Sequence, residues 1–133
     1  SSTVAIHGGT SCVASGTTGG NCVIRLKNGS GATLDSITIS PRADTGNGSD
    51  SYGTFAFTVS IPPAGNLSTQ NIDHECSVIG VETSGSASLY GCMGGGATTA
   101  TENLSNATTL ILTISGASNT TANLYGVVGV AQR

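Results

Sequence analysis

The sequence predicts an all-β fold, an antiparallel β-sandwich of about seven to nine strands, from three observations. Apolar and polar residues alternate over most of the chain, which is the period of a strand with one buried face. Clusters of Gly, Ser, Thr and Asn separate these segments at roughly the 8–12-residue spacing of sandwiches and barrels. The chain has 20 glycines in 133 residues, and each glycine costs a helix about 1 kcal/mol relative to alanine.

The clearest strand covers residues 52–61. Phe55, Phe57 and Val59 alternate with Thr54, Ala56 and Thr58, so one face of the strand is apolar and the other is polar or small. Two prolines, Pro62 and Pro63, follow directly and end the strand, because proline cannot donate to a β-ladder. This segment is therefore expected to lie half-buried, with its phenylalanines in the core.

The same alternation predicts the other strands. Asn28-Gly29 supplies turn chemistry between two of them. Only residues 98–106 allow a turn of helix. The predicted strands are residues 2–7, 21–28, 33–40, 76–81, 87–91, 108–115 and 123–131.

Composition excludes two classes of partner. The chain has four basic and seven acidic residues and no basic stripe, so it lacks the electrostatic attraction that dominates nucleic-acid binding. No apolar run approaches the roughly 20 residues that span a bilayer, so we expect no membrane span. The first residue is Ser1, which indicates a mature or trimmed form. A surface this poor in charge tends to associate unless sugar or a partner covers it.

Four cysteines predict two disulfides. Three pairings are open, and we favour Cys12 with Cys22 and Cys76 with Cys92, because each pair brackets a Gly/Ser-rich segment that can turn back. A zinc site is the alternative, but the spacings contain no C-x-x-C pair. Disulfides in turn indicate an oxidising, extracellular compartment.

Six of the nine asparagines begin an Asn-x-Ser/Thr sequon, more than chance predicts. A sequon carries a glycan only on a chain that enters the secretory route, and the glycan must project into solvent. We therefore expect a glycosylated protein of the cell surface, with these acceptor asparagines on exposed loops: Asn28, Asn47, Asn66, Asn103, Asn106 and Asn119.

No catalytic, cofactor-binding or metal-binding residues are expected. The Asp73-His74-Glu75 cluster has no G-x-S-x-G nucleophile turn beside it, and we interpret it as a solvated bend. Residues 44–50 offer oxygen atoms to Ca²⁺ but lack the EF-hand spacing, so a polar turn is favoured. The triple glycine of residues 94–96 has no helix after it to form a phosphate site and is interpreted as a flexible spacer.

The N-terminal segment, residues 1–9, is set apart from a single domain of residues 10–133. Val4 and Ile6 alternate with small or polar residues, and Gly8-Gly9 then forms a natural hinge. A strand tethered in this way can pair with its own sheet or with the open edge of another copy, where its side chains fill pockets. We expect Val4 and Ile6 to contact a neighbouring subunit.

The segment RLKNGSGATL and the strand after it, residues 25–39, resembles the strand–turn–strand of secreted β-sandwich domains in prokaryotic pili and surface threads. The low charge and many sequons are similar to glycosylated filament subunits of archaea. The resemblance implies an immunoglobulin-like or pilin-like sandwich and a non-enzymatic subunit of an extracellular filament, a homopolymer joined by donated strands. The alternative is a monomeric adhesive or carbohydrate-binding module, acting through Tyr90 or Tyr125.

Overall fold

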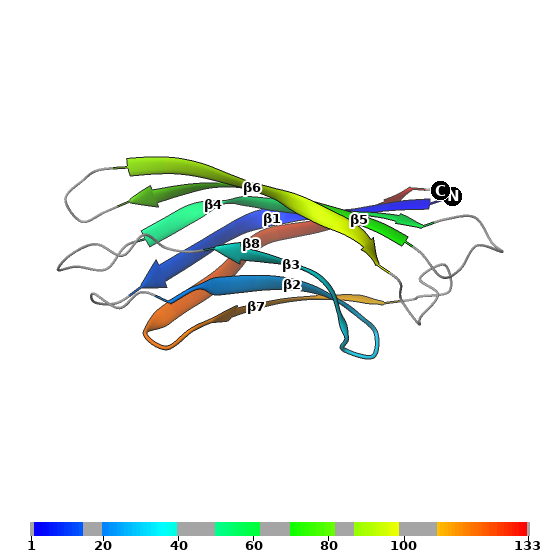
Figure 1. Cartoon of the computed structure of the whole chain (residues 1–133), viewed down its shortest axis with the longest axis horizontal. Coiled ribbons are helices and arrows are strands. Elements are labelled where there is room, and N and C mark those ends of the chain that lie inside the picture. Colours follow the sequence, from blue (N-terminus) through cyan, green and yellow to red (C-terminus); the bar gives the residue numbers. More distant parts are fainter. Residues whose placement is uncertain are drawn as a thin grey trace.

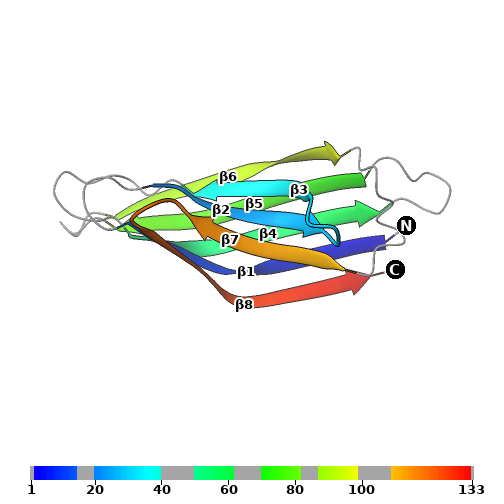
Figure 2. The same ribbon diagram turned by 90° about the horizontal axis from the view of Figure 1, so that it is seen from below.

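The computed structural model of the chain describes residues 2–14, 20–39, 50–61, 70–81, 87–98 and 109–132. They form two antiparallel sheets, one of five strands in the order β6-β5-β4-β1-β8 and one of three in the order β3-β2-β7. Figure 1 shows the sheets as two layers, and Figure 2 shows the smaller sheet in front of the larger one, with the strands of both running along the long axis of the molecule. The all-β prediction is confirmed. The strands are β1 (Ser2–Ala14), β2 (Cys22–Asn28), β3 (Thr33–Ile39), β4 (Asp50–Ile61), β5 (Gln70–Val81), β6 (Ala87–Thr98), β7 (Leu110–Gly116) and β8 (Thr120–Gln132).

One cluster of buried side chains joins the two sheets. Ile24 and Leu26 of β2 and Phe57 and Val59 of β4 are fully buried in it. The period-two patterns that predicted residues 21–28 and 52–61 as half-buried strands are confirmed. Each large apolar side chain removed from water in this way contributes about 1.5–3 kcal/mol of stability.

β1 is the second strand from one edge of the larger sheet and pairs on both sides. It pairs with β4 from Ser2 to Val13 and with β8 from Thr3 to Ala14. Ile6 is 9% exposed in the chain's own core, and Val4 packs against the same cluster. In the single chain the strand runs through Gly8-Gly9, because the neighbouring strands satisfy its backbone hydrogen bonds on both sides. The expected separation of residues 1–9 from the domain of residues 10–133 stays a prediction.

A disulfide joins Cys12 of β1 to Cys22 of β2 and so ties the two sheets together, with 5.9 Å between the Cα atoms. This pairing was predicted and is confirmed, and it excludes both cysteines as zinc ligands. Cys76 is also disulfide-bonded, and the β5–β6 register places it opposite Cys92. The side chain of Cys92 lies outside the described residues, so the pairing of Cys76 with Cys92 stays a prediction.

Two segments that were interpreted as irregular are strands. The triple glycine of residues 94–96 lies within β6 and pairs with Ile72, Asp73 and His74 of β5, so it is not a spacer. The Asp73-His74-Glu75 cluster lies in the middle of β5 rather than at a bend. Glycine has little strand propensity of its own, but the neighbouring strand supplies its hydrogen bonds.

The turn between β2 and β3 is closed by an asparagine side chain. Asn28 Oδ1 accepts hydrogen bonds from the Ala32 N–H at 2.9 Å and from the Ser30 hydroxyl at 2.8 Å. Gly31 has a φ of +91°, a conformation that residues with a side chain rarely adopt. These contacts explain why the sequence Asn28-Gly29-Ser30-Gly31 connects the two strands.

Replacing Cys12 and Cys22 together by alanine should lower the free energy of unfolding by about 3 kcal/mol, the loop-closure entropy of a loop of this length. Guanidinium titration followed by circular dichroism measures the change. An unchanged unfolding midpoint would show that the inter-sheet disulfide does not contribute to stability.

Candidate functional site

The sequon asparagines fall into three groups. Asn119 is exposed in the turn between β7 and β8, with a φ of 60°, so it can carry a glycan. Asn28 is only 6% exposed and its amide oxygen closes a turn, so the expectation that it projects into solvent is wrong. Asn47, Asn66, Asn103 and Asn106 lie outside the described residues.

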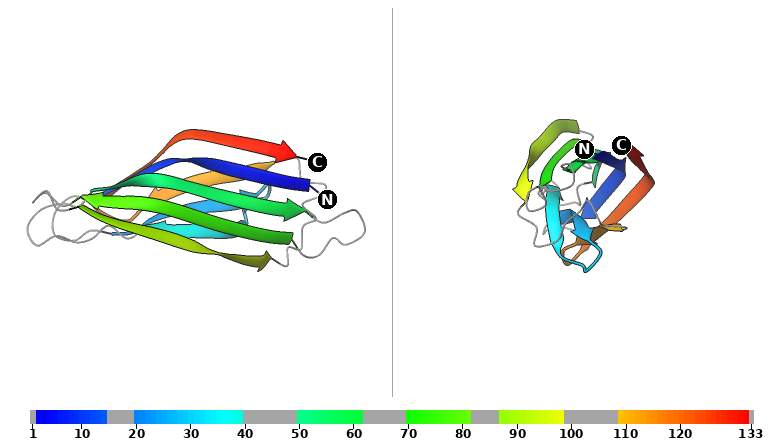
Figure 3. Two further views of the ribbon diagram at one scale, coloured as in Figure 1. Left: turned by 90° about the horizontal axis from the view of Figure 1, so that it is seen from above. Right: turned by 90° about the vertical axis from the view of Figure 1, so that its right-hand side faces the viewer.

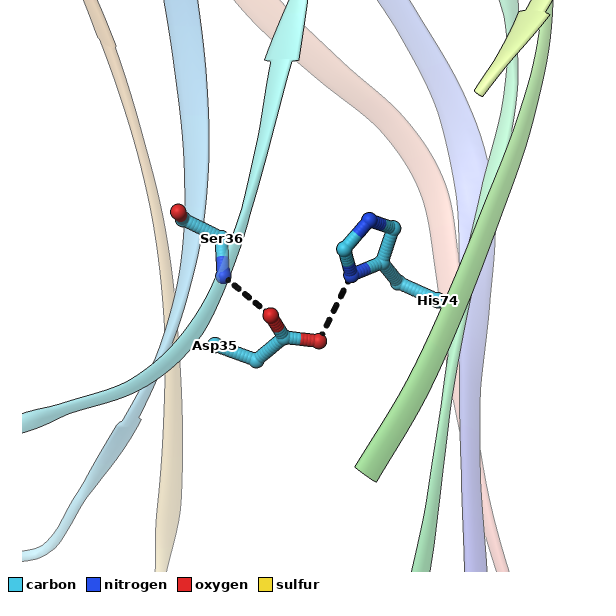
Figure 4. A network of polar contacts seen from close by, with 3 residues as sticks. All are labelled: Asp35, Ser36 and His74. Carbon is cyan, nitrogen blue, oxygen red and sulfur yellow. Dashed lines mark hydrogen bonds and ion pairs between the residues drawn. The ribbon is translucent and has the colours of Figure 1, made fainter. Parts of the chain in front are cut away.

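A polar contact connects the two sheets beside the core. The imidazole Nδ1 of His74, on β5, lies 2.7 Å from Asp35 Oδ2 of β3, and Figure 4 shows the two side chains meeting between the strands. The Ser36 N–H donates to the other carboxylate oxygen at 2.8 Å. The His74 and Phe57 rings pack in a T-shaped arrangement with 6.2 Å between their centroids. The carboxylate therefore holds the imidazole in a fixed orientation.

This pair resembles the base and orienting acid of a hydrolase triad but lacks the third member among the described residues. A triad needs a hydroxyl or thiol within hydrogen-bond reach of the other imidazole nitrogen, and the Ser36 hydroxyl points away from the ring (Figure 4). Asp73 and Glu75 point to the opposite face of β5 from His74 and are exposed. The Asp35–His74 contact can hold the two sheets together, and none of the described residues beside it supplies a nucleophile.

A trough of 730 Å³ lies on the outer face of the five-stranded sheet and crosses β1, β4, β5 and β8. Thr54 and Ala56 place it on the face opposite the core, because they alternate with the buried Phe55 and Phe57. The strand pairing arranges the lining side chains in two rows, one on each side of the trough. One row is Glu75, Ala56 and His7, and the other is Ser77, Thr54 and Tyr125.

A β-bulge forms one end of the trough. Gly9 lies opposite Tyr125 and His7 opposite Val128, so β8 has one residue more than β1 in this interval. Gly126 takes a φ of +54° there, the left-handed conformation that such a bulge uses. The extra residue bends β8 and directs Tyr125 over the outer face of the sheet.

Tyr125 is exposed but held in place. The residue is 55% exposed, and its hydroxyl shares a hydrogen bond of 3.1 Å with the Ser11 hydroxyl. A Cβ atom on Gly8 would point to the core side of the sheet, 2.9 Å from the Tyr125 carbonyl oxygen and 3.2 Å from the Phe55 ring, so glycine is required where β1 and β8 approach each other at the bulge. Gly9, which lies beside Tyr125 and also lines the trough, has no side chain either. The result is an exposed aromatic ring beside a floor without side chains.

A second exposed tyrosine, Tyr52, lies on the same face outside the trough. Its hydroxyl donates to Asp50 Oδ2 at 3.0 Å. This hydrogen bond is the largest cause that raises the pKa of Tyr52 above its ordinary value, with smaller contributions from partial burial and from the negative charge of Asp50.

Among the trough residues, the sequence analysis gave a ligand-binding role only to Tyr125. It did not place His7, Thr54, Glu75 and Ser77 at one site, because the pairing of four strands brings them together and no local motif records that pairing. One signal in the sequence could have helped, the glycines at predicted strands: Gly8-Gly9 directly after one strand, and Gly126 directly after Tyr125 within another. Side chains of β6, including Tyr90, lie outside the description.

The described part of the chain contains no group of three or more metal-ligating side chains, and residues 44–49 of the loop considered for Ca²⁺ lie outside it. None of the described elements is a helix long and apolar enough to cross a membrane. Comparison with known protein families, curated proteins and solved structures finds no match to this chain.

Replacing Asp35 by alanine should lower the free energy of unfolding by about 1–3 kcal/mol, because the half-buried His74 then loses its hydrogen-bond partner. Asp73→Ala, an exposed carboxylate next to His74 in sequence, is the matched control and should change stability by less than about 0.5 kcal/mol. Equal effects of the two substitutions in urea titrations would contradict a specific role for the Asp35–His74 contact.

Replacing Asp50 by asparagine should lower the pKa of Tyr52 towards its ordinary value of about 10. Phenolate absorbance during an alkaline titration measures it, and a Tyr52→Phe variant isolates the Tyr52 contribution. Because the folded-state pKa is raised, the small stabilisation is complete below the unfolded pKa and is lost as the pH rises through the folded value. An identical titration in both proteins would show that Asp50 does not cause the shift.

Proposed function

We propose that the chain is a secreted, glycosylated and non-enzymatic structural subunit of an extracellular filament, built on an immunoglobulin-like or pilin-like β-sandwich. Copies join when residues 2–9 of β1 leave their own sheet and complete the sheet of a neighbour. The observation that carries this proposal is the division of β1 into an anchored half and a half without a covalent anchor. The resemblance of residues 25–39 to subunits of pili and surface threads points the same way.

The anchored half is residues 10–14. Cys12 is bonded to Cys22 of β2 in the same chain, so this part of β1 cannot move to another copy. Residues 2–9 carry no cysteine. The pairing of residues 3–7 with β8 is offset from that of residues 9–14 by the register shift between His7 and Gly9. A strand that exchanges between copies therefore has a natural place to separate at Gly8-Gly9.

The exchanged half takes apolar side chains with it. Opening residues 2–9 removes Ile6 from the core and Val4 from its edge, which costs up to about 1.5–3 kcal/mol for each fully buried side chain. The same side chains from another copy fill the vacated space without new geometry. This is the physics of domain swapping, in which the contacts within and between copies are the same.

Exchange alone conserves contacts, so a polymer needs additional stabilisation between copies. β8 provides an apolar surface beside the exchanged half of β1, since Val128 pairs with His7 and Val130 pairs with Ala5. Val127, Val128 and Val130 are each 44–46% exposed. Uncharged, exposed edge strands readily pair with other chains, and burial of these valines between copies would stabilise the polymer.

The alternative function is a monomeric adhesive or carbohydrate-binding module. One observation favours it, the exposed ring of Tyr125 beside the trough. The filament proposal is preferred because it also accounts for the disulfide position, the register shift and the exposed valines.

Cysteine pairs can report which copy supplies β1. Ala5 lies opposite Thr58 of β4, and Thr58 also lies opposite Asp73 of β5. In oxidised filaments, Ala5→Cys with Thr58→Cys should yield a ladder of covalent multimers on a non-reducing gel, because β1 comes from a neighbour. The matched pair Thr58→Cys with Asp73→Cys should yield monomers, because β4 and β5 stay in one chain.

We expect negative-stain microscopy of the native material to show filaments, in which the two cysteine pairs are then compared. A native protein that stays monomeric, or filaments in which the Ala5–Thr58 pair gives only monomers, would contradict the exchange of β1.

A further inference from the structure

We infer that the trough on the outer face of the five-stranded sheet binds a neutral oligosaccharide. The inference does not depend on strand exchange, because the trough is complete whether residues 7–9 come from the same chain or from another copy. It rests on an oriented aromatic ring, a floor without side chains and polar groups on both sides.

The aromatic ring suits the apolar face of a sugar. The C–H groups on one face of a pyranose pack against a flat ring, and exposed, rigid aromatic side chains give contact area at little entropic cost. Tyr125 meets this requirement because the shared hydrogen bond with Ser11 restrains the hydroxyl end of the ring. Gly8, Gly9 and Gly126 leave the backbone open next to it.

The polar groups of the trough suit hydroxyl groups rather than a charged ligand. The carboxylate of Glu75 accepts hydrogen bonds from hydroxyls, and bonds of this kind are stronger than neutral ones. Thr54 and Ser77 both donate and accept. Neither lysine nor arginine lines this part of the described surface, so an anionic sugar would face Glu75 without a compensating guanidinium or ammonium group.

The backbone around the trough is already arranged for binding. Its floor consists of paired strands, with continuous β4–β5 and β1–β4 ladders, and the bulge at Gly126 fixes the end where Tyr125 projects. β-bulges often redirect a side chain beside a functional site. A ligand therefore need not order the protein when it binds.

The oligosaccharide can have two sources, a glycan attached to another copy of this chain or a saccharide of a different surface. The test uses protein produced without N-glycans and with its disulfides intact. One arm offers immobilised neutral oligosaccharides containing glucose, mannose, galactose or N-acetylglucosamine, with sialylated forms for comparison. The other arm offers glycans released from the native protein.

We expect at least one neutral oligosaccharide to bind and to shift the amide resonances of Gly8, Gly9 and Gly126. Tyr125→Ala should weaken binding about tenfold or more, the effect of losing an aromatic contact, and Glu75→Gln should weaken it less. Tyr52→Ala is the matched control, since Tyr52 is exposed on the same face but does not line the trough; its affinity should stay within about twofold.

Each outcome decides the inference. Binding of the released glycans assigns the trough to contacts between copies, and binding only of other oligosaccharides assigns it to adhesion. No binding of any neutral oligosaccharide at millimolar concentration, or equal losses in the folded Tyr125→Ala and Tyr52→Ala proteins, would overturn it. A preference for sialylated forms would contradict the assignment of a neutral ligand.

Discussion

The two backbone ladders of β1 hold the larger sheet together. β4 accepts the strand on one side and β8 on the other, and together the two ladders extend from Ser2 to Ala14. Without residues 2–9, the N-terminal parts of both ladders would lose their partners and the core would lose Ile6. Figure 3 shows the consequence for the ends of the chain: the start of β1 and the end of β8 lie side by side at one end of the molecule. Any account of assembly must therefore begin with what fills this place between β4 and β8.

The inter-sheet disulfide divides the strand into parts with different freedom. Residues 10–14 are fixed through Cys12, whereas residues 2–9 are held by noncovalent contacts alone. The bulge opposite Gly8 lies at the join between these parts, and the same bulge directs Tyr125 over the outer trough. One local irregularity thus serves both proposals, since it marks where the proposed exchangeable segment would separate from the anchored one and forms the end of the trough proposed to bind a saccharide.

The sequence predicted correctly the strands whose structure depends on side-chain patterning. β2 and β4 alternate strictly, and their inward side chains are those that the pattern indicated. Prediction failed where the partner strand decides. The glycines of residues 94–96 have no side-chain pattern, yet they extend β6 because β5 pairs with them. The Asp35–His74 contact and the trough were missed because their residues come from different strands, and the position of β1 was left open because alternation does not reveal which edges accept a strand.

Hydrogen exchange of the native monomer tests the division of β1 most directly. Amides of residues 2–9 and of residues 10–14 are protected by the same two neighbouring strands, so a single cooperative unit would exchange them together. If residues 2–9 can leave without the rest, their amides exchange by a smaller opening, several-fold to many-fold faster than those of residues 10–14, and they become protected in filaments. Equal exchange of both halves, at the rate of global unfolding, would contradict an exchangeable N-terminal strand.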